Sequence, residues 1–239
     1  MPNVKDIQFR IKRYKPGVID PPRFQTYSLA VTEQMSVLDC LEVIRFEQDP
    51  SLMYRHSCHH SSCGTCACII NGMEQLACMT NVWEFETTEV TLEPLNGFTV
   101  IGDLTVDMEM LFRDLDEKWS YLCSAESSRA DIKRPPMQAF TRFENCIECG
   151  SCLSVCPVTP EPESFMGPAA LAMIHREMIK DPRKKASMLA LANGNRGESL
   201  CRRALGCSRV CPTGVYPARH IADIRRAIAE DIKGKNNSR

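Results

Sequence analysis

Residues 146–157 read CIECGSCLSVCP, and residues 201–212 read CRRALGCSRVCP. The first stretch has the spacing C-x2-C-x2-C-x3-C-P, and the second ends on the same C-x3-C-P. Such a run is typical of domains that hold two iron–sulfur clusters, where three cysteines ligate one cluster and the fourth ligates the other. One run therefore predicts a partner run, and the second stretch supplies it.

The two runs differ at one position. When they are aligned on the terminal Cys-Pro, Ala204 stands where the first run has its second cysteine. By the crossover rule, the complete ligand set for a [4Fe–4S] cluster is Cys146, Cys149, Cys152 and Cys211. The other set is short by one and consists of Cys156, Cys201 and Cys207. Because a methyl group cannot ligate iron, we expect a [3Fe–4S] cluster there, although the sequence leaves open a fourth ligand from solvent.

A third motif lies in the first half of the chain. Residues 58–66 read CHHSSCGTC, a C-x4-C-x2-C spacing, and Cys78 follows twelve positions later. This spacing is typical of plant-type [2Fe–2S] centres. Gly64 permits the positive φ angles of a tight loop, and Asn71-Gly72 predicts a hairpin turn that brings the last cysteine back. The predicted ligands are Cys58, Cys63, Cys66 and Cys78, with backbone N–H groups of the loop directed at the sulfurs.

Other interpretations of these residues are weaker. A structural zinc site is the main alternative, because zinc also takes thiolate ligands. His59 and His60 suggest a Rieske centre, but Cys63-Gly64-Thr65-Cys66 contributes no histidine to a second matched element. Cys40, Cys68 and Cys123 fit none of the sets, and we expect each to be a packed thiol that behaves as a small hydrophobe.

Composition limits the remaining possibilities. The 239 residues are 44% hydrophobic and 25% charged with a net charge of -1, which favours two globular domains and offers no basic field for nucleic acid. No signal peptide and no apolar stretch of about 18 residues is evident, so we expect a cytoplasmic protein that does not span a membrane. Fourteen cysteines in a reducing compartment indicate metal ligation rather than disulfides. No nucleophile–base constellation or nucleotide-binding fingerprint is present, which predicts no catalytic residues on this chain.

The chain changes character near residues 103–110. Before it, alternation predicts strands over 4–14, 24–31, 67–70 and 89–94. Ser36 is expected to cap a helix over 37–47, whose apolar surface includes Val37, Leu38, Leu41, Ile44 and Phe46. After it, helices are predicted over 108–115, 168–180 and 217–232, and Arg134-Pro135-Pro136 is expected in an exposed connection. The prediction is an α+β chain with domains at 1–106 and 107–239.

The order of these motifs resembles the iron–sulfur subunit of succinate dehydrogenase and fumarate reductase, over nearly the whole chain. The segments Leu76–Cys78, Phe143–Gly150 and Phe165–Leu171 are similar to that family as well, and the last is closer to the fumarate-reductase branch. The resemblance implies an N-terminal β-grasp plant-type ferredoxin domain and a C-terminal, all-α domain like bacterial ferredoxins.

The resemblance also implies partners. A flavoprotein with covalent FAD would oxidise succinate or reduce fumarate and dock near the [2Fe–2S] domain. A membrane anchor would carry quinone, and often haem, near the [3Fe–4S] cluster. The chain would then lie peripherally on the cytoplasmic face of the inner membrane and relay electrons between FAD and quinone.

One departure from the family concerns the quinone. Many succinate dehydrogenases have a tryptophan pair soon after the Cys-Pro and a histidine after the first cysteine of the last run. Here Val158-Thr159 follows Pro157, and Arg202 follows Cys201. Pro157 and Arg202 are therefore the candidates for a quinone contact, with Arg203 as a further donor. The alternative is the same relay serving a flavoprotein with another substrate, or a soluble or thiol electron donor.

Overall fold

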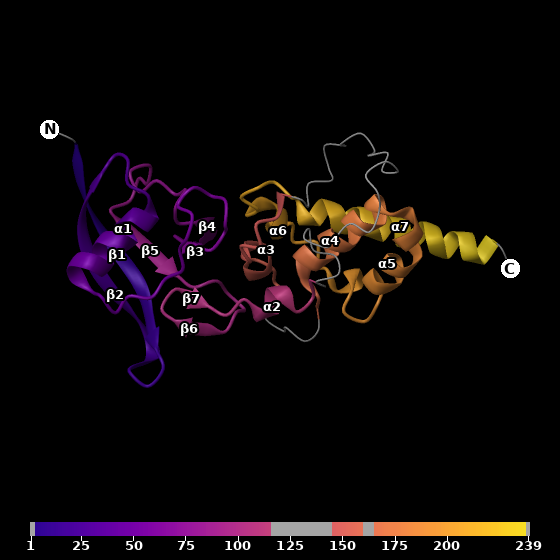
Figure 1. The fold of residues 1–239 in the computed structure, drawn as a ribbon, viewed down its shortest axis with the longest axis horizontal. Helices are drawn as coiled ribbons and strands as arrows, with labels where there is room; N and C mark the ends of the chain where they lie inside the picture. The colour runs from indigo at the N-terminus through magenta and orange to yellow at the C-terminus, as the bar shows by residue number, and fades with distance from the viewer. Residues whose placement is uncertain (1–2, 116–144, 160–164, 238–239) are drawn as a thin grey trace, which may run out of the picture. The chain divides into compact units, whose positions relative to one another are not determined.

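The computed structural model describes residues 3–115, 145–159 and 165–237. The chain divides into two compact units, which are described separately below (Figure 1). The first unit comprises residues 1–108 together with 147–155, and the second comprises 109–146 and 156–239. The short stretch 147–155 thus groups with the first unit, whereas the sequence assigned it to a domain 107–239. The boundary at 106/107 stays a prediction.

The first unit is built on a five-stranded sheet in the order β2-β1-β5-β3-β4. Its strands are β1 (Val4–Lys15), β2 (Ile19–Thr32), β3 (Ala67–Ile70), β4 (Met73–Leu76) and β5 (Glu89–Glu93). β1 pairs antiparallel with β2 and parallel with β5. Alternate residues of β1, Ile7, Phe9 and Ile11, are buried, as the apolar–polar alternation of its sequence predicts. A second, two-stranded ribbon joins β6 (Val100–Gly102) to β7 (Thr105–Val106).

The predicted hairpin between β3 and β4 is present. Asn71 and Gly72 connect the two strands, with φ angles of 49° and 80°. Positive φ at both central residues is what a two-residue turn needs to match strand twist, and Asn-Gly tolerates it best. This turn sets the register that pairs Ala67 with Leu76, and so it brings the segments that carry Cys66 and Cys78 side by side.

The capped helix is also present, with one correction. Ser36 caps α1 (Val37–Val43) and forms a capping box with Asp39, and the helix continues as the π-helical turn η1 (Ile44–Gln48). Phe46, expected on the apolar surface, is 82% exposed. That expectation is wrong because a residue nine positions after Val37 lies about half a turn away from it on a helix.

A buried cation ties several parts of this unit together. Arg13, at the end of the apolar row of β1, is 1% exposed. It donates hydrogen bonds to Tyr27, Asp49 and Ser51, and its Nε lies 2.9 Å from Asp103 Oδ1. Although burial alone would raise it, the pKa of Asp49 is held well below its usual range by hydrogen bonds from Ser51, Tyr27 and Arg13. Asp103 accepts from the backbone N–H groups of Tyr14 and Met53, both at 2.8 Å.

Arg13→Met should therefore destabilise the first unit by about 3 kcal/mol or more, because removing one partner leaves buried carboxylates without a cation. The matched control is Arg23→Met. Arg23 is the direct cross-strand partner of Arg13 but is exposed, so its loss should cost less than about 0.5 kcal/mol. Urea unfolding of both variants compares the costs, and equal destabilisation would contradict the role of the buried network.

The second unit is helical in its described part. Its longer helices are α4 (Gly167–Lys180), α5 (Lys185–Ala192) and α7 (Pro217–Asn237), with shorter turns α2 (Glu109–Phe112), η4 (Pro182–Lys184), η5 (Glu198–Leu200) and α6 (Gly206–Arg209). Apolar side chains of α4, α5 and α7 form one core that includes Leu171, Leu189 and Ile224. Pro168 lies in the first turn of α4, where its missing N–H costs nothing.

The predicted helices over 168–180 and 217–232 are thus present, whereas 108–115 holds only the single turn α2. Arg134-Pro135-Pro136 lies outside the described residues. No helix in the described ranges is long and apolar enough to cross a membrane.

Two imidazoles meet inside this helical core. His175 of α4 and His220 of α7 place their Nδ1 atoms 2.8 Å apart, and His220 is 1% exposed. Burial, and then the neighbouring His175, lowers the pKa of His220 to about 4, and the carboxylate of Asp223 only partly opposes this. Burial also lowers the pKa of His175. Both rings are therefore neutral at pH 7 in the folded chain.

The helical unit should lose stability as the pH falls from about 7 toward 4. Below about pH 6.5 the unfolded chain protonates His220, whereas the folded chain, in which the pKa of His220 is about 4, does not, so protons favour unfolding by up to about 1.4 kcal/mol per pH unit. Urea unfolding followed by helical circular dichroism at pH 7.5 and 5.5 measures this slope. His220→Gln should flatten it, whereas the exposed His60→Gln should leave it unchanged. An unchanged slope in His220→Gln would contradict the assignment.

Candidate metal centres

The loop 58–66 forms a nest of N–H groups around one sulfur. The backbone N–H groups of His60, Ser62 and Cys63 point at Cys58 Sγ, at 3.5, 3.2 and 3.3 Å. The N–H of His60 lowers the pKa of Cys58 to about 7, helped by those of Cys63 and Ser62. Donors directed at a sulfur stabilise its thiolate form, which is the form that ligates metals. The expectation that the loop directs N–H groups at its sulfurs is met at this cysteine.

The hairpin brings the other sulfurs of this loop together. Cys66 and Cys78 interact with one another, and Cys63 lies close enough to add to the charge that Cys66 experiences. Burial, with smaller contributions from these thiols, raises the pKa of Cys66 to about 12. Such a thiol is protonated at neutral pH unless a cation binds it, because metal coordination deprotonates thiols. The four cysteines are thus gathered by β3, β4 and the loop, and their chemistry fits a bound metal group.

Gly64 lies directly against the second cysteine segment. A Cβ atom at Gly64 would lie 2.6 Å from the carbonyl oxygen of Ile147 and 2.8 Å from Cys149 Cβ. Its φ angle of 69° also favours glycine. Within the first unit, the loop 58–66 and the stretch 147–155 are therefore in backbone contact. Helix α3 (Ser151–Ser154) carries Cys152 and follows Gly150, whose φ is 83°.

Arg55 indicates negative charge at this junction. Its Nε and Nη2 atoms are buried and have no hydrogen-bond partner among the residues that the structure describes. Burial lowers the pKa of Arg55, and the nearby Cys68, Cys149 and Cys66 oppose that shift as far as they are charged. Buried guanidinium nitrogens without hydrogen-bond acceptors are costly, so the arrangement needs negatively charged acceptors nearby. Iron–sulfur clusters with thiolate ligands would supply them, which supports the fit of the cysteines to such groups.

The remaining predicted ligands lie in the second unit. Cys146 and Cys211 both pack against a small apolar cluster of Ala172, Met173 and Val215. The backbone N–H of Val215 points at Cys211 Sγ at 3.3 Å. The predicted set of four is thus divided between the two compact units, with Cys149 and Cys152 in the first and Cys146 and Cys211 in the second.

The predicted set of three lies wholly in the second unit. Cys156 and Cys201 pack beside the core of α4, α5 and α7, and Cys207 lies on α6. Burial, followed by the charges of Cys156 and Cys201, raises the pKa of Cys207 to about 11, so the three sulfurs are close neighbours. Ala204 is exposed and offers only its methyl group.

A mononuclear zinc site is not supported at these cysteines. Zinc–thiolate bonds of 2.3 Å place tetrahedral sulfur ligands about 3.8 Å apart. Among the described residues, the group of three donors that lie within 4.8 Å of one another is Glu42, His56 and His59, and it contains no cysteine. No three cysteine sulfurs of the described residues lie that close together, as the ligands of a single zinc ion would. From the sequence, His59 was considered only as a Rieske ligand, and Glu42, His56 and Arg55 carry no motif that would have pointed to them.

Cys40, Cys68 and Cys123 lie outside the three predicted ligand sets, and Pro157 and Arg202 are the predicted quinone contacts. Cys40 and Cys68 are buried thiols, as expected, and burial raises the pKa of each to about 12. Cys123 lies outside the described residues. Pro157 and Arg202 are both exposed.

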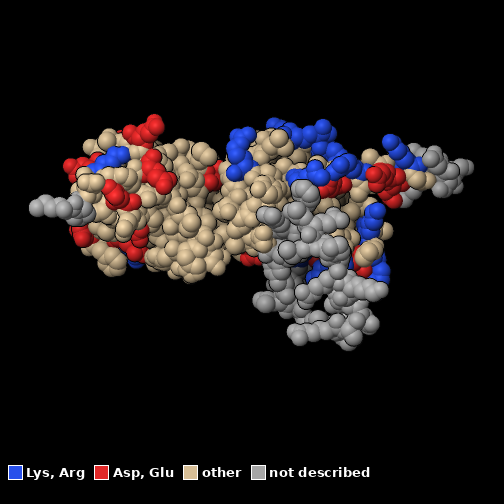
Figure 2. All heavy atoms as spheres, turned by 90° about the horizontal axis from the view of Figure 1, so that it is seen from above, with Lys and Arg blue, Asp and Glu red and all other residues tan. Residues whose placement is uncertain are grey.

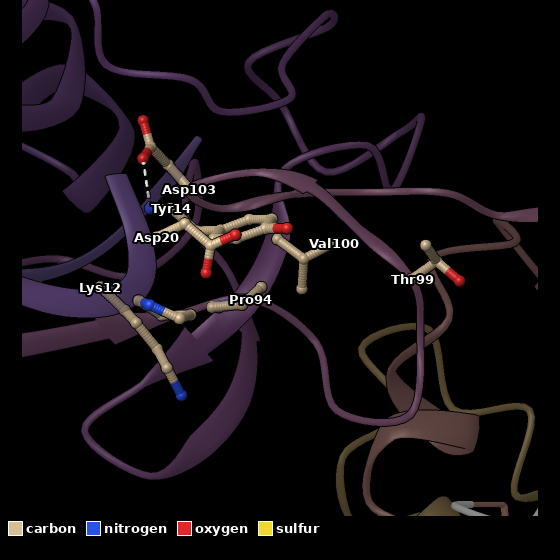
Figure 3. A pocket seen from close by; sticks show the side chains of 8 residues that line it. Lys12, Tyr14, Asp20, Pro94, Thr99, Val100 and Asp103 are labelled. Atoms are coloured by element: carbon tan, nitrogen blue, oxygen red, sulfur yellow. Dashed lines mark hydrogen bonds between the residues drawn. The ribbon is translucent and has the colours of Figure 1, made fainter. Parts of the chain in front are cut away.

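A surface hollow of about 450 Å³ in the first unit lies apart from these centres (Figure 3). Its lining includes Lys12, Tyr14, Asp20 and Asp103, and Asp103 accepts the Tyr14 N–H there. No cysteine or histidine is among the side chains that line it. We therefore assign it no part in metal binding.

The surfaces of the two units differ in charge. On the face in Figure 2, acidic groups gather on the first unit and basic groups on the second. The sequence agrees: residues 1–108 hold 8 Lys and Arg against 14 Asp and Glu, and residues 109–239 hold 21 against 16. Each unit therefore presents a different electrostatic surface to any partner.

Comparison with known proteins places these sites in context. A "2Fe-2S iron-sulfur cluster binding domain" family matches residues 8–113, and a "4Fe-4S dicluster domain" family matches residues 142–215. The fumarate reductase iron-sulfur subunit of Haemophilus influenzae is 31% identical over 97% of this chain and 96% of its own length. That of Escherichia coli is 34% identical over 91% of both chains. A solved chain described as "Mycobacterium smegmatis Sdh1 complex in the apo form" is similar in fold, with a TM-score of 0.80 over 96% of this chain and 98% of that chain, at 24% identity.

Gly64→Ala should abolish or strongly weaken the optical signature of a [2Fe–2S] centre, because its methyl group meets backbone on the neighbouring segment. Gly72→Ala is the matched control: its φ of 80° carries the same left-handed penalty, about 1 kcal/mol, but nothing lies within 4 Å of the added methyl. Visible circular dichroism of the purified chains compares the two variants. Equal effects would show that backbone conformation, and not the close approach, makes glycine necessary.

Proposed function

This chain belongs to the family of fumarate reductase iron–sulfur subunits, and on that premise we propose that it relays electrons through three clusters between a flavoprotein and a quinone. It is a subunit of an oxidoreductase complex, with one [2Fe–2S] and one [4Fe–4S]-type domain. The proposed ends of the relay are succinate or fumarate chemistry at FAD on the flavoprotein, and quinone at a membrane anchor.

The proposed ligands follow the spacing of the cysteines. Cys58, Cys63, Cys66 and Cys78 hold the [2Fe–2S] cluster. The second set, for the [4Fe–4S] cluster, is Cys146, Cys149, Cys152 and Cys211. The third set, for a [3Fe–4S] cluster, is Cys156, Cys201 and Cys207. The N–H groups at Cys58, the neighbouring thiols of Cys66 and Cys78, and the mutual influence of the third set support this division.

Once bound, such clusters accept and donate single electrons at potentials that depend on cluster type, charge and hydrogen bonding. The protein's part is to hold them close together and to adjust those potentials. The backbone contact between Gly64 and Cys149 supports a short step from the first cluster to the second. Arg55, among Cys66, Cys68 and Cys149, adds positive charge at the same junction, which favours a reduced and more negative cluster.

The finer features of the family are part of the same proposal. The sheet order supports a β-grasp fold for the first domain, and the helical second unit supports a fold like bacterial ferredoxins.

We propose a flavoprotein partner with FAD near the [2Fe–2S] domain, and a membrane anchor with quinone, and in some complexes haem, near the [3Fe–4S] cluster. The chain would then lie peripherally on the cytoplasmic face of the inner membrane, where the exposed Pro157 and Arg202 could contact quinone. Co-purification of soluble partners alone would favour another substrate or a thiol donor instead.

The observation that carries the proposal is Ala204. It occupies the place of one cysteine in an otherwise complete pair of runs, and it is exposed in the structure. An ordinary two-cluster protein would have two equal [4Fe–4S] centres. A three-iron centre makes the stations of the relay unequal, because reduction potential depends on cluster type and charge.

Electron paramagnetic resonance of the oxidised protein should show a [3Fe–4S] signal, and Ala204→Cys should lose most of it by completing a [4Fe–4S] site. Leu205→Cys is the matched control, because Leu205 is also exposed but a thiol there has the wrong spacing, so the signal should remain. Absence of the signal from the unaltered protein would refute the third cluster.

A further inference from the structure

Three metal-ligating side chains meet at the surface of the first unit. Glu42 lies on α1, His56 comes shortly before the first cysteine motif, and His59 is the second residue of that motif. Their donor atoms lie within 4.8 Å of one another. We propose that Glu42, His56 and His59 bind one divalent transition-metal ion of the zinc class, separately from the iron–sulfur clusters.

The distances fit a single ion. Zinc–nitrogen and zinc–oxygen bonds of about 2.1 Å place tetrahedral ligands about 3.4 Å apart. His56 Nδ1 and His59 Nε2 are 3.2 Å apart, and Glu42 Oε1 lies 3.7 Å from the first and 3.5 Å from the second. All three separations lie within 0.3 Å of that ideal edge, so one ion could contact all three donors with little movement.

Hydrogen bonding alone accounts less well for this arrangement. The two imidazole nitrogens are close enough to share one proton. The carboxylate oxygen, at 3.5 and 3.7 Å, is farther from both rings than a hydrogen bond allows. A bound cation would satisfy the carboxylate and both nitrogen lone pairs together.

The type of site follows from its donors and its exposure. Two imidazoles and one carboxylate suit zinc, copper(II) and nickel(II) better than magnesium or calcium, which prefer oxygen ligands alone. The side chains are 30 to 40% exposed, so a fourth position stays open to water or to a ligand from solvent. The Ser36 capping box orders the start of the helix that carries Glu42, and the ring of Tyr54 lies 5.2 Å from that of His56.

The location suggests what the ion would change. His59 directly follows Cys58, so a bound ion adds two positive charges beside the first cysteine set. If that set holds the [2Fe–2S] cluster, as proposed above, binding should raise the reduction potential of that cluster. Binding itself does not depend on that assumption, so the two ideas fail separately.

Calorimetric titration of the full, cluster-loaded chain with Zn²⁺ tests the site, because thiols already committed to iron do not compete. We expect one equivalent to bind. Glu42→Gln, His56→Gln and His59→Gln should each weaken the affinity for Zn²⁺ at least ~10-fold. Even mutation of a residue that only hydrogen-bonds to a metal ligand typically lowers metal affinity by ~10-fold or more. His60→Gln is the matched control: His60 lies in the same loop, but its Nδ1 is engaged by the carbonyl of Cys58.

Two further results would decide the matter. Copper(II) in place of zinc should give an electron paramagnetic resonance spectrum with splitting from two nitrogens, and His56→Gln should reduce this to one. Visible circular dichroism shows whether each variant keeps its [2Fe–2S] signature, and Glu42→Gln, which lies on a helix outside the cysteine loop, tests the site even if the loop variants do not. Unchanged zinc affinity in Glu42→Gln, or equal weakening in His60→Gln, would overturn the proposal.

Discussion

The backbone of Gly64 lies so close to Ile147 and Cys149 that no Cβ atom fits between them. Other interactions within the first unit hold these two segments together. The Asn71-Gly72 turn sets the register beside the loop, and Glu74 of β4 accepts a 2.7 Å hydrogen bond from Ser154 of α3. The same Ser154 hydroxyl accepts the N–H of Asn96 at 2.9 Å. A nine-residue stretch that is distant in sequence is thereby held on the sheet that carries the first cysteine motif.

Burial of thiols in each unit, and of two Arg55 donors in the first, is unfavourable without a metal group. Burial raises the pKa of Cys66 to about 12 and that of Cys207 to about 11, while Arg55 keeps two buried donors unpaired. Metal ions convert such thiols to thiolates, and in the first unit those thiolates supply the negative charge that the Arg55 guanidinium lacks. Folding and cluster binding are therefore expected to stabilise one another in this chain.

The sequence was sufficient for features that depend on local rules. Cysteine spacing, strand alternation in β1, the Asn-Gly hairpin and the Ser36 cap each follow from a few neighbouring residues, and all are present as predicted. Phe46 was misplaced although helical periodicity would have excluded it. What the sequence could not predict depends on contacts between distant segments. Three features can be seen only in the folded chain. Residues 147–155 pack with the first unit, Arg55 lies among cysteines, and Glu42 lies close to His56.

Charge is divided unevenly between the two halves of the chain. An excess of six acidic groups over basic ones in residues 1–108 and an excess of five basic groups in residues 109–239 cancel in the net charge of -1, so the total conceals the difference. Surfaces of opposite sign steer different partners, because long-range fields select encounter complexes before any contact forms. Ala204 belongs to the basic half and is exposed, so a molecule that approaches the proposed three-iron site would meet a surface that favours acidic groups.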